Sequence, residues 1–411
     1  MSQFEQFPGR EELIQEFRSG AESSPLKINN HIHSPYSFSA FGDIAEAVHM
    51  AAGEDVMVLG INDFYVADGY KEFISRCTDH GVFPLLNIEM IGISKEDQQN
   101  GIRVNDPGNP GRTYISGKGL AYPFELPPSQ DEKLKGVISE SNSQVAKMIE
   151  LLNNWMLSQE VGIEISVEEI MDKLAHNLLR ERHVVKMLRL RLEEKAGDDQ
   201  EFYALLEKLY DGKLPKSKRS DIAGTENELR SMLLKSGAPA FVPEDSKAFL
   251  PLEDIVKIIR VAGGIPTYPL LLDGAGDHIT EFEDGKEQLL EKLVQRGFSS
   301  IEFIPLRNEL GILKEYVEFF YKNGFVVSFG TEHNTSAMLP ITVSAKGGAE
   351  LDESLKTISY RGAAYVAAHQ YLVASEGPGY QSQSRDEMEL LGEALFKHYF
   401  DTINPSFAKN Q

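Results

Sequence analysis

The sequence has few of the features that mark secreted or membrane proteins. Its one cysteine, Cys77, cannot form a disulfide within the chain. No apolar run approaches the roughly 18 residues that a membrane-spanning helix needs. The first residues lack the basic and apolar regions of a secretion signal. We therefore expect a cytoplasmic protein that does not enter a membrane.

Positive charge is also scarce. The chain has 41 Lys and Arg residues against 63 Asp and Glu residues, which gives a formal net charge of −22 at pH 7. Because proteins grip the nucleic-acid backbone with Lys and Arg, this balance argues against a nucleic-acid duplex as partner. A small anionic substrate remains compatible, since a metal ion and one or two basic side chains reverse the field inside a pocket. We expect a small-molecule partner, and the sequence leaves the oligomeric state open.

The chain does contain a repeated alternation of apolar strands and amphipathic helices. Strands are predicted at 26–30, 56–61 and 82–89, and the alternation returns over 252–304 and 325–330. This order is typical of an α/β protein with a mainly parallel sheet. Between the two parts, one further strand is predicted at 112–116, and a helical pattern covers 140–236, where Ser166 begins a capping signal.

Polar side chains stand where several predicted strands end. In parallel α/β sheets and barrels these ends carry the functional groups. The residues concerned are His31, His33, Asp63, Glu89 and Glu332. His31 and His33 are two residues apart on a strand, so they face the same side. Two imidazoles and two carboxylates suit one divalent ion such as Zn²⁺, Mn²⁺ or Fe²⁺. The histidine pair alone would also fit two exposed or hydrogen-bonded histidines.

The order of these motifs resembles the PHP (polymerase and histidinol phosphatase) superfamily of metal-dependent phosphoesterases, in its small-nucleotide branch. The resemblance covers roughly residues 26–340. The barrel segments that carry it are His31–Ser37 (HxHTxxS in the family), Ile61–Phe64 (TDH), Asn87–Glu89 (PGIE), Gly264–Pro269 (GG…AHP) and Gly330–Asn334 (GSDxH). In the middle of the chain, Arg180–Val185 resembles the branch's RPHIA segment and Ala238–Pro243 its PAYVP segment.

The resemblance implies a distorted seven-stranded (β/α) barrel of PHP type with a helical insertion. It divides the chain into a first barrel part (1–98), a mainly helical insertion (99–245), a second barrel part (246–345) and a C-terminal helical tail (346–411). It also implies that His31, His33, Glu89 and Glu332 together hold one metal ion.

The chain departs from the family at several other metal-binding positions. The family usually binds three ions, and the residues that stand at lost ligand positions here are Phe38, Phe64, Tyr114, Tyr268 and Asn334. Phenylalanine cannot bind a metal, and tyrosine does so only when deprotonated. The pattern therefore predicts that the second and third sites are filled by rings and that a single ion remains.

Further roles follow from position and resemblance. Asp63 is the predicted catalytic group, as a general base or as a residue that orients a ligand, although it could instead cap the next turn. The predicted substrate-binding residues are Arg180, Arg182, His183 and Tyr268.

The predicted function is a metal-dependent hydrolase, by resemblance a phosphoesterase acting on a small phosphorylated metabolite or nucleotide. Two alternatives stay open: another metal-dependent enzyme (lyase, isomerase or carbohydrate-directed), or an inactive PHP-fold binding protein.

Overall fold

Seven strands form the centre of the molecule in the computed structural model, which describes residues 4, 6–19, 24–272, 279–381 and 383–403. They follow the spatial order β1-β2-β3-β4-β6-β7-β8. Their bounds are β1 (Lys27–Ile32), β2 (Val56–Phe64), β3 (Phe83–Ile93), β4 (Arg112–Lys118), β6 (Ile265–Leu270), β7 (Ser300–Phe303) and β8 (Val326–Phe329), and the short β5 (Leu250–Pro251) pairs with β3. All neighbours are parallel except β4, which runs antiparallel to β3 and β6.

The two end strands meet at the carboxyl ends of β1 and β8, so the barrel is nearly closed. Ile32 forms a parallel bridge with Glu332. The backbone N–H of His33 donates to the carbonyl of Glu332 at 2.8 Å, and the N–H of Glu332 donates to the carbonyl of His31 at 2.9 Å. The predicted α/β fold with a distorted seven-stranded barrel is thus confirmed, and its closure brings two segments with predicted site residues together.

The strand predicted at 112–116 is present as β4 and lies in the middle of the barrel sheet. The range 99–245, predicted as a mainly helical insertion, therefore contributes one strand to the barrel. Its helices begin after this strand, with α5 (Pro128–Ser158).

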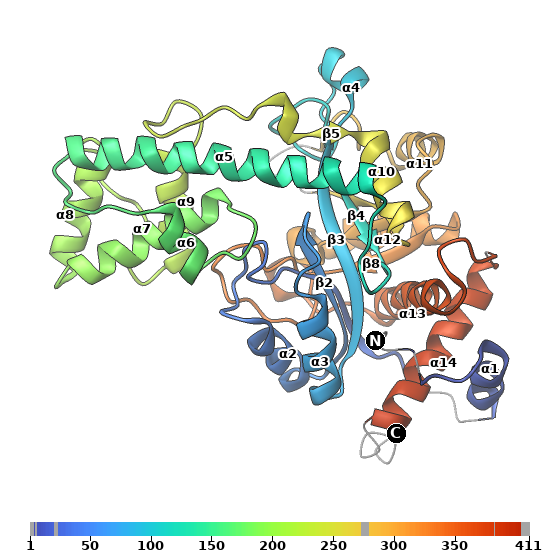
Figure 1. The fold of residues 1–411 in the computed structure, drawn as a ribbon. Helices are drawn as coiled ribbons and strands as arrows, with labels where there is room; N and C mark the ends of the chain where they lie inside the picture. Colours follow the sequence, from blue (N-terminus) through green and yellow to red (C-terminus); the bar gives the residue numbers. More distant parts are fainter. Residues whose placement is uncertain (1–3, 5, 20–23, 273–278, 382, 404–411) are drawn as a thin grey trace.

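The helices that connect the strands pack on the outside of the barrel (Figure 1). These are α2 (Ile44–Gly53), α3 (Tyr70–His80), α10 (Leu252–Val261), α11 (Lys286–Gln295) and α12 (Leu310–Lys322), whereas the short α4 (Lys95–Gln99) lies beyond the end of β3. Short 3₁₀ helices are η1 (Ser246–Ala248), η3 (Pro305–Arg307) and η4 (Lys346–Gly348). At the other end of the chain, α13 (Glu353–Glu376) packs against β1, β3 and β8 and against α14 (Arg385–Ile403), which also contacts α1 (Arg10–Arg18).

A helical segment projects from the barrel and has a hydrophobic core of its own (Figure 1). It consists of α5, α6 (Val167–Lys173), α7 (Glu181–Lys195), α8 (Asp199–Leu209) and α9 (Ile222–Leu233). Helix α5 joins the two cores, because Leu134 packs in the barrel core and Met148 in that of the segment. Ser166 caps α6 by accepting a hydrogen bond from the N–H of Glu169 at 3.1 Å, at the predicted capping position.

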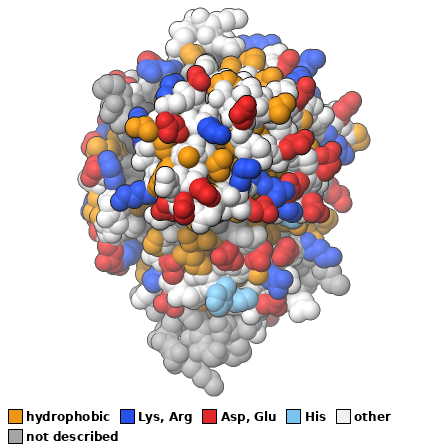
Figure 2. Space-filling model, turned by 90° about the vertical axis from the view of Figure 1, so that its left-hand side faces the viewer, with side chains coloured by type: hydrophobic (Ala, Val, Ile, Leu, Met, Phe, Trp, Pro, Cys, Tyr) orange, Lys and Arg blue, Asp and Glu red, His pale blue; other side chains and the backbone are white. Residues whose placement is uncertain are grey.

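Charged side chains of both signs are intermixed on the face that the helical segment presents in Figure 2. Isolated exposed apolar residues such as Leu157 and Leu214 occur among the exposed hydrophobic residues of the segment. Scattered exposure of this kind is ordinary for a solvated surface. Within the described part of the chain, the membrane criterion is also negative, since none of its helices combines the length and the apolar character that a bilayer crossing requires.

Closure of the barrel depends on a glycine after β8. A Cβ atom at Gly330 would lie 2.1 Å from the Cβ of His31. We expect Gly330→Ala to lower the free energy of unfolding by about 1–3 kcal/mol, because β8 must move away from β1. Urea denaturation measures this change. Gly311→Ala is the matched control, since a Cβ there meets nothing within 4 Å, and equal stability of the two variants would contradict the prediction.

Candidate metal centre and anion pocket

Three of the predicted ligands meet where the carboxyl end of β1 lies beside the middle of β3. The Nε2 atoms of His31 and His33 are 3.2 Å apart. Oε2 of Glu89 lies 3.2 Å from Nε2 of His33 and 3.8 Å from Nε2 of His31. All three residues are buried, and within the described residues they form a group whose ligand atoms lie within 4.8 Å of one another.

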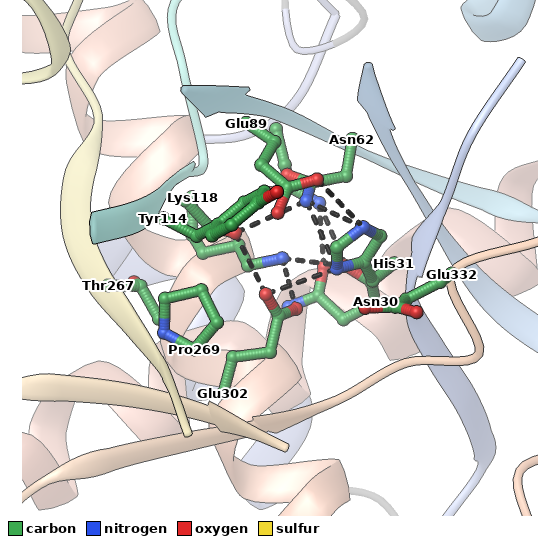
Figure 3. A network of polar contacts seen from close by, with 12 residues as sticks. Asn30, His31, Asn62, Glu89, Tyr114, Lys118, Thr267, Pro269, Glu302 and Glu332 are labelled. Atoms are coloured by element: carbon green, nitrogen blue, oxygen red, sulfur yellow. Dashed lines mark hydrogen bonds and ion pairs between the residues drawn. The ribbon is translucent and has the colours of Figure 1, made fainter. Parts of the chain in front are cut away.

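A buried ion pair fixes the orientation of His31 (Figure 3). Its Nδ1 lies 3.1 Å from Oε2 of Glu302, and Glu302 also pairs with the ammonium group of Lys118. Burial raises the pKa of the Glu302 carboxyl, but the charge of Lys118 and the contact with His31 outweigh it and lower the pKa to about 2. Glu302 is therefore ionised and accepts a hydrogen bond from the Nδ1–H group of His31. This tautomer leaves a lone pair on Nε2.

The hydroxyl group of Ser37 links His33 to Asp63 and fixes the orientation of the His33 ring. Its Nδ1 lies 3.1 Å from Oγ of Ser37, and that hydroxyl donates to Oδ1 of Asp63 at 2.6 Å. Since the hydroxyl group of Ser37 donates its proton to Asp63, its oxygen accepts a hydrogen bond from the Nδ1–H group of His33. Burial and the neighbouring His31 lower the pKa of His33, so the ring is neutral. Its Nε2 also carries a lone pair.

The donor set therefore fits a divalent cation. Two lone pairs and a carboxyl oxygen converge on one point, and a divalent cation between them would be favourable. The amide nitrogen of Asn62 lies 2.9 and 3.1 Å from the two ring nitrogens of His31. Because Nδ1 carries the proton donated to Glu302, only Nε2 could accept from this amide, and a donor this close to both nitrogens is poorly aligned with the Nε2 lone pair. Burial, more than any neighbouring charge, raises the pKa of Glu89 to about 8.

Asp63 is enclosed by hydroxyl groups next to His33, which favours the second of its two predicted roles, that of orienting a ligand, over that of a general base. It is 1% exposed and accepts hydrogen bonds from the N–H of Ser34 at 2.7 Å and from the hydroxyls of Ser34 and Ser37. Burial raises the pKa of Asp63 to about 6, against the lowering effect of these bonds. The carboxylate orients His33 through Ser37 and is a positioning residue.

Glu332, the fourth predicted ligand, is not gathered with the other three among the described residues. Its φ of 64° and that of His333, 54°, are both positive, which is rare for residues other than glycine. This turn directs the carboxylate toward Arg307 at 3.8 Å and the amide of Asn334 at 3.4 Å. Its side chain is 23% exposed and lines the adjoining cavity.

A cavity of about 430 Å³ opens beside the three ligands and is rich in arginine. Glu89, Glu332, Phe38, Phe64 and Tyr114 line it, together with Arg180, Arg182, Arg230 and Arg307. The four arginines outnumber the three acidic residues of the lining, Glu89, Asp106 and Glu332, so the cavity has a local excess of positive groups in a chain with a net charge of −22. The predicted placement of Arg180 and Arg182 at a pocket next to the ligands agrees with this geometry.

Two of these arginines have no carboxylate within ion-pair distance among the described residues. Arg180, which precedes α7, lies with its guanidinium carbon 4.2 Å from the ring centre of Phe64. Phe64 in turn stacks on His33, with ring centres 5.0 Å apart. Arg182 donates to Asn227 at 3.2 Å. Burial and the charges of Arg230 and Arg180 lower the pKa of Arg182 to about 10, so an anion between these groups would relieve their repulsion.

The other two predicted substrate contacts lie elsewhere. Tyr268 is on the opposite face of β6 from Pro269, which lines the cavity. Its ring packs against Phe282 and Phe298 and its hydroxyl donates to Glu283 at 2.9 Å. Side chains alternate across a strand, so the residue aligned with the family's histidine points out of the barrel. His183 is 1% exposed and lines a different cavity, on the far side of Phe38.

Sequence reasoning missed the residues that orient His31. Lys118, Glu302 and Asn62 form the polar interior of the barrel under the ligands (Figure 3). The available signal was a carboxylate in the apolar strand Ser300–Phe303 and a lysine at the end of β4. Buried charged residues are rare unless they are paired, so each of these two positions indicated a partner elsewhere in the chain. The sequence alone did not show which residue that partner is.

Comparisons with known proteins support the fold. No family model and no curated relative matches the sequence. The chain is similar to a solved structure from Bifidobacterium adolescentis described as a "putative metal-dependent phosphoesterase", with a TM-score of 0.51, 12% identity, and coverage of 82% of this chain and 96% of that chain. An amidohydrolase from Chromobacterium violaceum has a TM-score of 0.46 and 15% identity, over 81% of this chain and 96% of that chain. At these identities the likeness concerns the fold.

The contact between Glu302 and His31 leads to a prediction about metal affinity. We expect Glu302→Gln to weaken binding of Zn²⁺ or Mn²⁺ by about 10- to 100-fold, because the neutral amide no longer fixes the tautomer of His31 or increases its basicity. Competition with a chelating dye measures the affinity. Glu283→Gln is the matched control, since Glu283 is equally buried but bonds to Tyr268 outside the barrel. Equal affinities in the two variants would refute the role of Glu302.

Proposed function

We propose that this protein is a metal-dependent hydrolase that cleaves a small phosphoester, and that it is a divergent member of the PHP superfamily. The observation that carries the proposal is the convergence of the His31 and His33 lone pairs with Glu89, beside arginines without carboxylate partners. The motif order and the description of the Bifidobacterium structure point in the same direction.

The metal ligands in this proposal are His31, His33 and Glu89. A bound Zn²⁺, Mn²⁺ or Fe²⁺ supplies Lewis acidity, which activates water and polarises a phosphoryl oxygen. We infer one ion per chain, because the rings of Phe64 and Tyr114 line the cavity where ligands of further ions stand in the family. Burial raises the pKa of Tyr114 to about 12, so its hydroxyl stays neutral and is a poor ligand.

The arginines account for substrate binding. Arg180 and Arg182 present guanidinium groups to the cavity, and such groups bind phosphate oxygens with charge-assisted hydrogen bonds. Phe64 and Tyr114 form an apolar wall that excludes water from the same place. Glu332 is the candidate proton acceptor, because its ion pair with Arg307 is long, at 3.8 Å, and its carboxylate lines the cavity. The expected substrate is a small phosphorylated metabolite or nucleotide.

Loss of a metal ligand tests the proposed chemistry. We expect metal-loaded protein to hydrolyse phosphoesters from a panel of small substrates, and His33→Ala to lower kcat/KM by at least about 100-fold. Chelation should have the same effect, and metal analysis should give one ion per chain. His49→Ala, on the exposed surface of α2, is the control. Turnover that survives His33→Ala would exclude the metal mechanism, and absence of turnover on every phosphoester would refute the proposed substrate class.

Substrate binding is tested separately by Arg182. We expect Arg182→Met to raise KM by about 10- to 100-fold, since a hydrogen bond to a charged group contributes about 1.5–3 kcal/mol. The metal content should not change. Arg219→Met is the control, because Arg219 pairs with Asp199 in the helical segment. Steady-state kinetics on the best phosphoester measures both, and an unchanged KM in Arg182→Met would show that this arginine does not bind the phosphate.

A further inference from the structure

A second cavity lies behind Phe38, on the side away from the metal ligands. Its volume is about 330 Å³, and Phe38 lines both this cavity and the arginine-rich one. His183 and Lys186 of α7 form part of its wall, and Tyr36 stacks on His176 at a ring distance of 4.2 Å in the same wall. The ring of Phe38 therefore separates two pockets.

Phe38 is held in place at a conformational cost. Its φ of 113° lies in a region that side chains other than glycine rarely adopt. Its N–H donates to the carbonyl of Ser34 at 3.2 Å, and its ring meets the ring of His183 edge-on, with centres 5.0 Å apart. Strain of this kind persists where the surroundings fix the residue, and it concentrates at binding sites.

His183 brings a hydrogen-bond donor to this cavity without an acceptor. Its Nδ1 accepts from the backbone N–H of Arg180 at 3.1 Å, so the ring proton is on Nε2. Nε2 is buried and has no hydrogen-bond partner within the described ranges. A buried donor without a partner is costly, and a ligand that offers an oxygen would remove this cost.

Lys186 adds a positive charge on the same face of α7, three residues after His183. In the described part of the chain, its ammonium group has no ion pair or hydrogen bond, and it lies 5.5 Å from the ring centre of Phe38. Burial lowers the pKa of Lys186, and this effect is larger than that of any single neighbouring charge that raises the pKa. Lys173 lines the same cavity but already pairs with Glu169 at 2.7 Å.

The acidic residues of this cavity stand at its exposed edge. Asp43 is exposed and caps α2 by accepting from the N–H of Glu46, and Glu72 pairs with Arg76 at 3.7 Å. Asp172 is exposed as well. Water screens these carboxylates, whereas His183 is fully buried and Lys186 is half-buried.

We propose that the cavity behind Phe38 is a second ligand site, in which His183 and Lys186 bind the phosphate or carboxylate group of a small molecule. The site is distinct from the proposed catalytic pocket, because Phe38 separates them and the donors differ. Arg180 serves both, with its guanidinium in the first pocket and its backbone N–H fixing the tautomer of His183 in the second.

Direct binding tests this site without metal or turnover, so its failure would not affect the proposed hydrolase. Inorganic phosphate and acetate are titrated calorimetrically into the metal-free full chain, at constant ionic strength maintained with sodium chloride. We expect at least one of these anions to bind to a site that is lost or weakened at least tenfold in Lys186→Met. That site should persist in Arg182→Met and in the matched control Lys173→Met.

Two further results decide the outcome. Lys186→Arg should restore binding, which separates the charge from a general effect on folding, and thermal unfolding of each variant checks that it is folded. Binding of phosphate alone shows that the site prefers a tetrahedral oxyanion, and binding of acetate shows that it accepts a carboxylate group. The proposal is overturned if neither anion binds, or if the only binding observed is lost in Arg182→Met. It is also overturned if Lys186→Met and Lys173→Met bind the anions with equal affinity.

Discussion

The buried pair of Lys118 and Glu302 is the interaction on which the candidate site depends. An isolated carboxylate inside a barrel would take up a proton, because burial alone favours its neutral form. The ammonium group of Lys118 keeps Glu302 charged, and the charged form accepts the stronger hydrogen bond from the Nδ1–H group of His31. The direction of the His31 lone pair thus follows from a charge on β4, on the opposite side of the barrel interior. The ligand geometry is a property of the whole barrel.

The sequence was sufficient to predict the residues at strand ends. Apolar strands are easy to recognise, and polar residues near the predicted end of such a strand were the candidates. His31 and His33 do lie at the carboxyl end of β1, whereas Glu89 lies inside β3, which continues to Ile93. Lys118 and Glu302 could not be predicted, because they are 184 residues apart and each has meaning only through the other. The fold itself was predictable, since it depends on the order of strands and helices more than on any single contact.

The residues that were placed incorrectly depend on local backbone detail. Tyr268 was aligned with a ligand of the family, but alternation along β6 directs its neighbours Thr267 and Pro269 inward. Glu332 follows its strand at the expected position, yet a positive φ turns its carboxylate toward Arg307. A residue's position in a motif and the direction of its side chain are separate properties, and one dihedral angle or one step along a strand is enough to change the direction.

The stacked contact of Arg180, Phe64 and His33 joins two stretches of chain with different roles. The residues of the metal-ligand cluster come from the barrel, whereas Arg180, Arg182 and Arg230 come from the helical segment. In the proposed function, substitutions between residues 180 and 230 would alter which anion is bound, while β1 and β3 keep the candidate metal ligands. Selectivity and metal binding are open to independent evolutionary change, and grafting a different helical segment onto the same barrel is a direct route to a different choice of ligand.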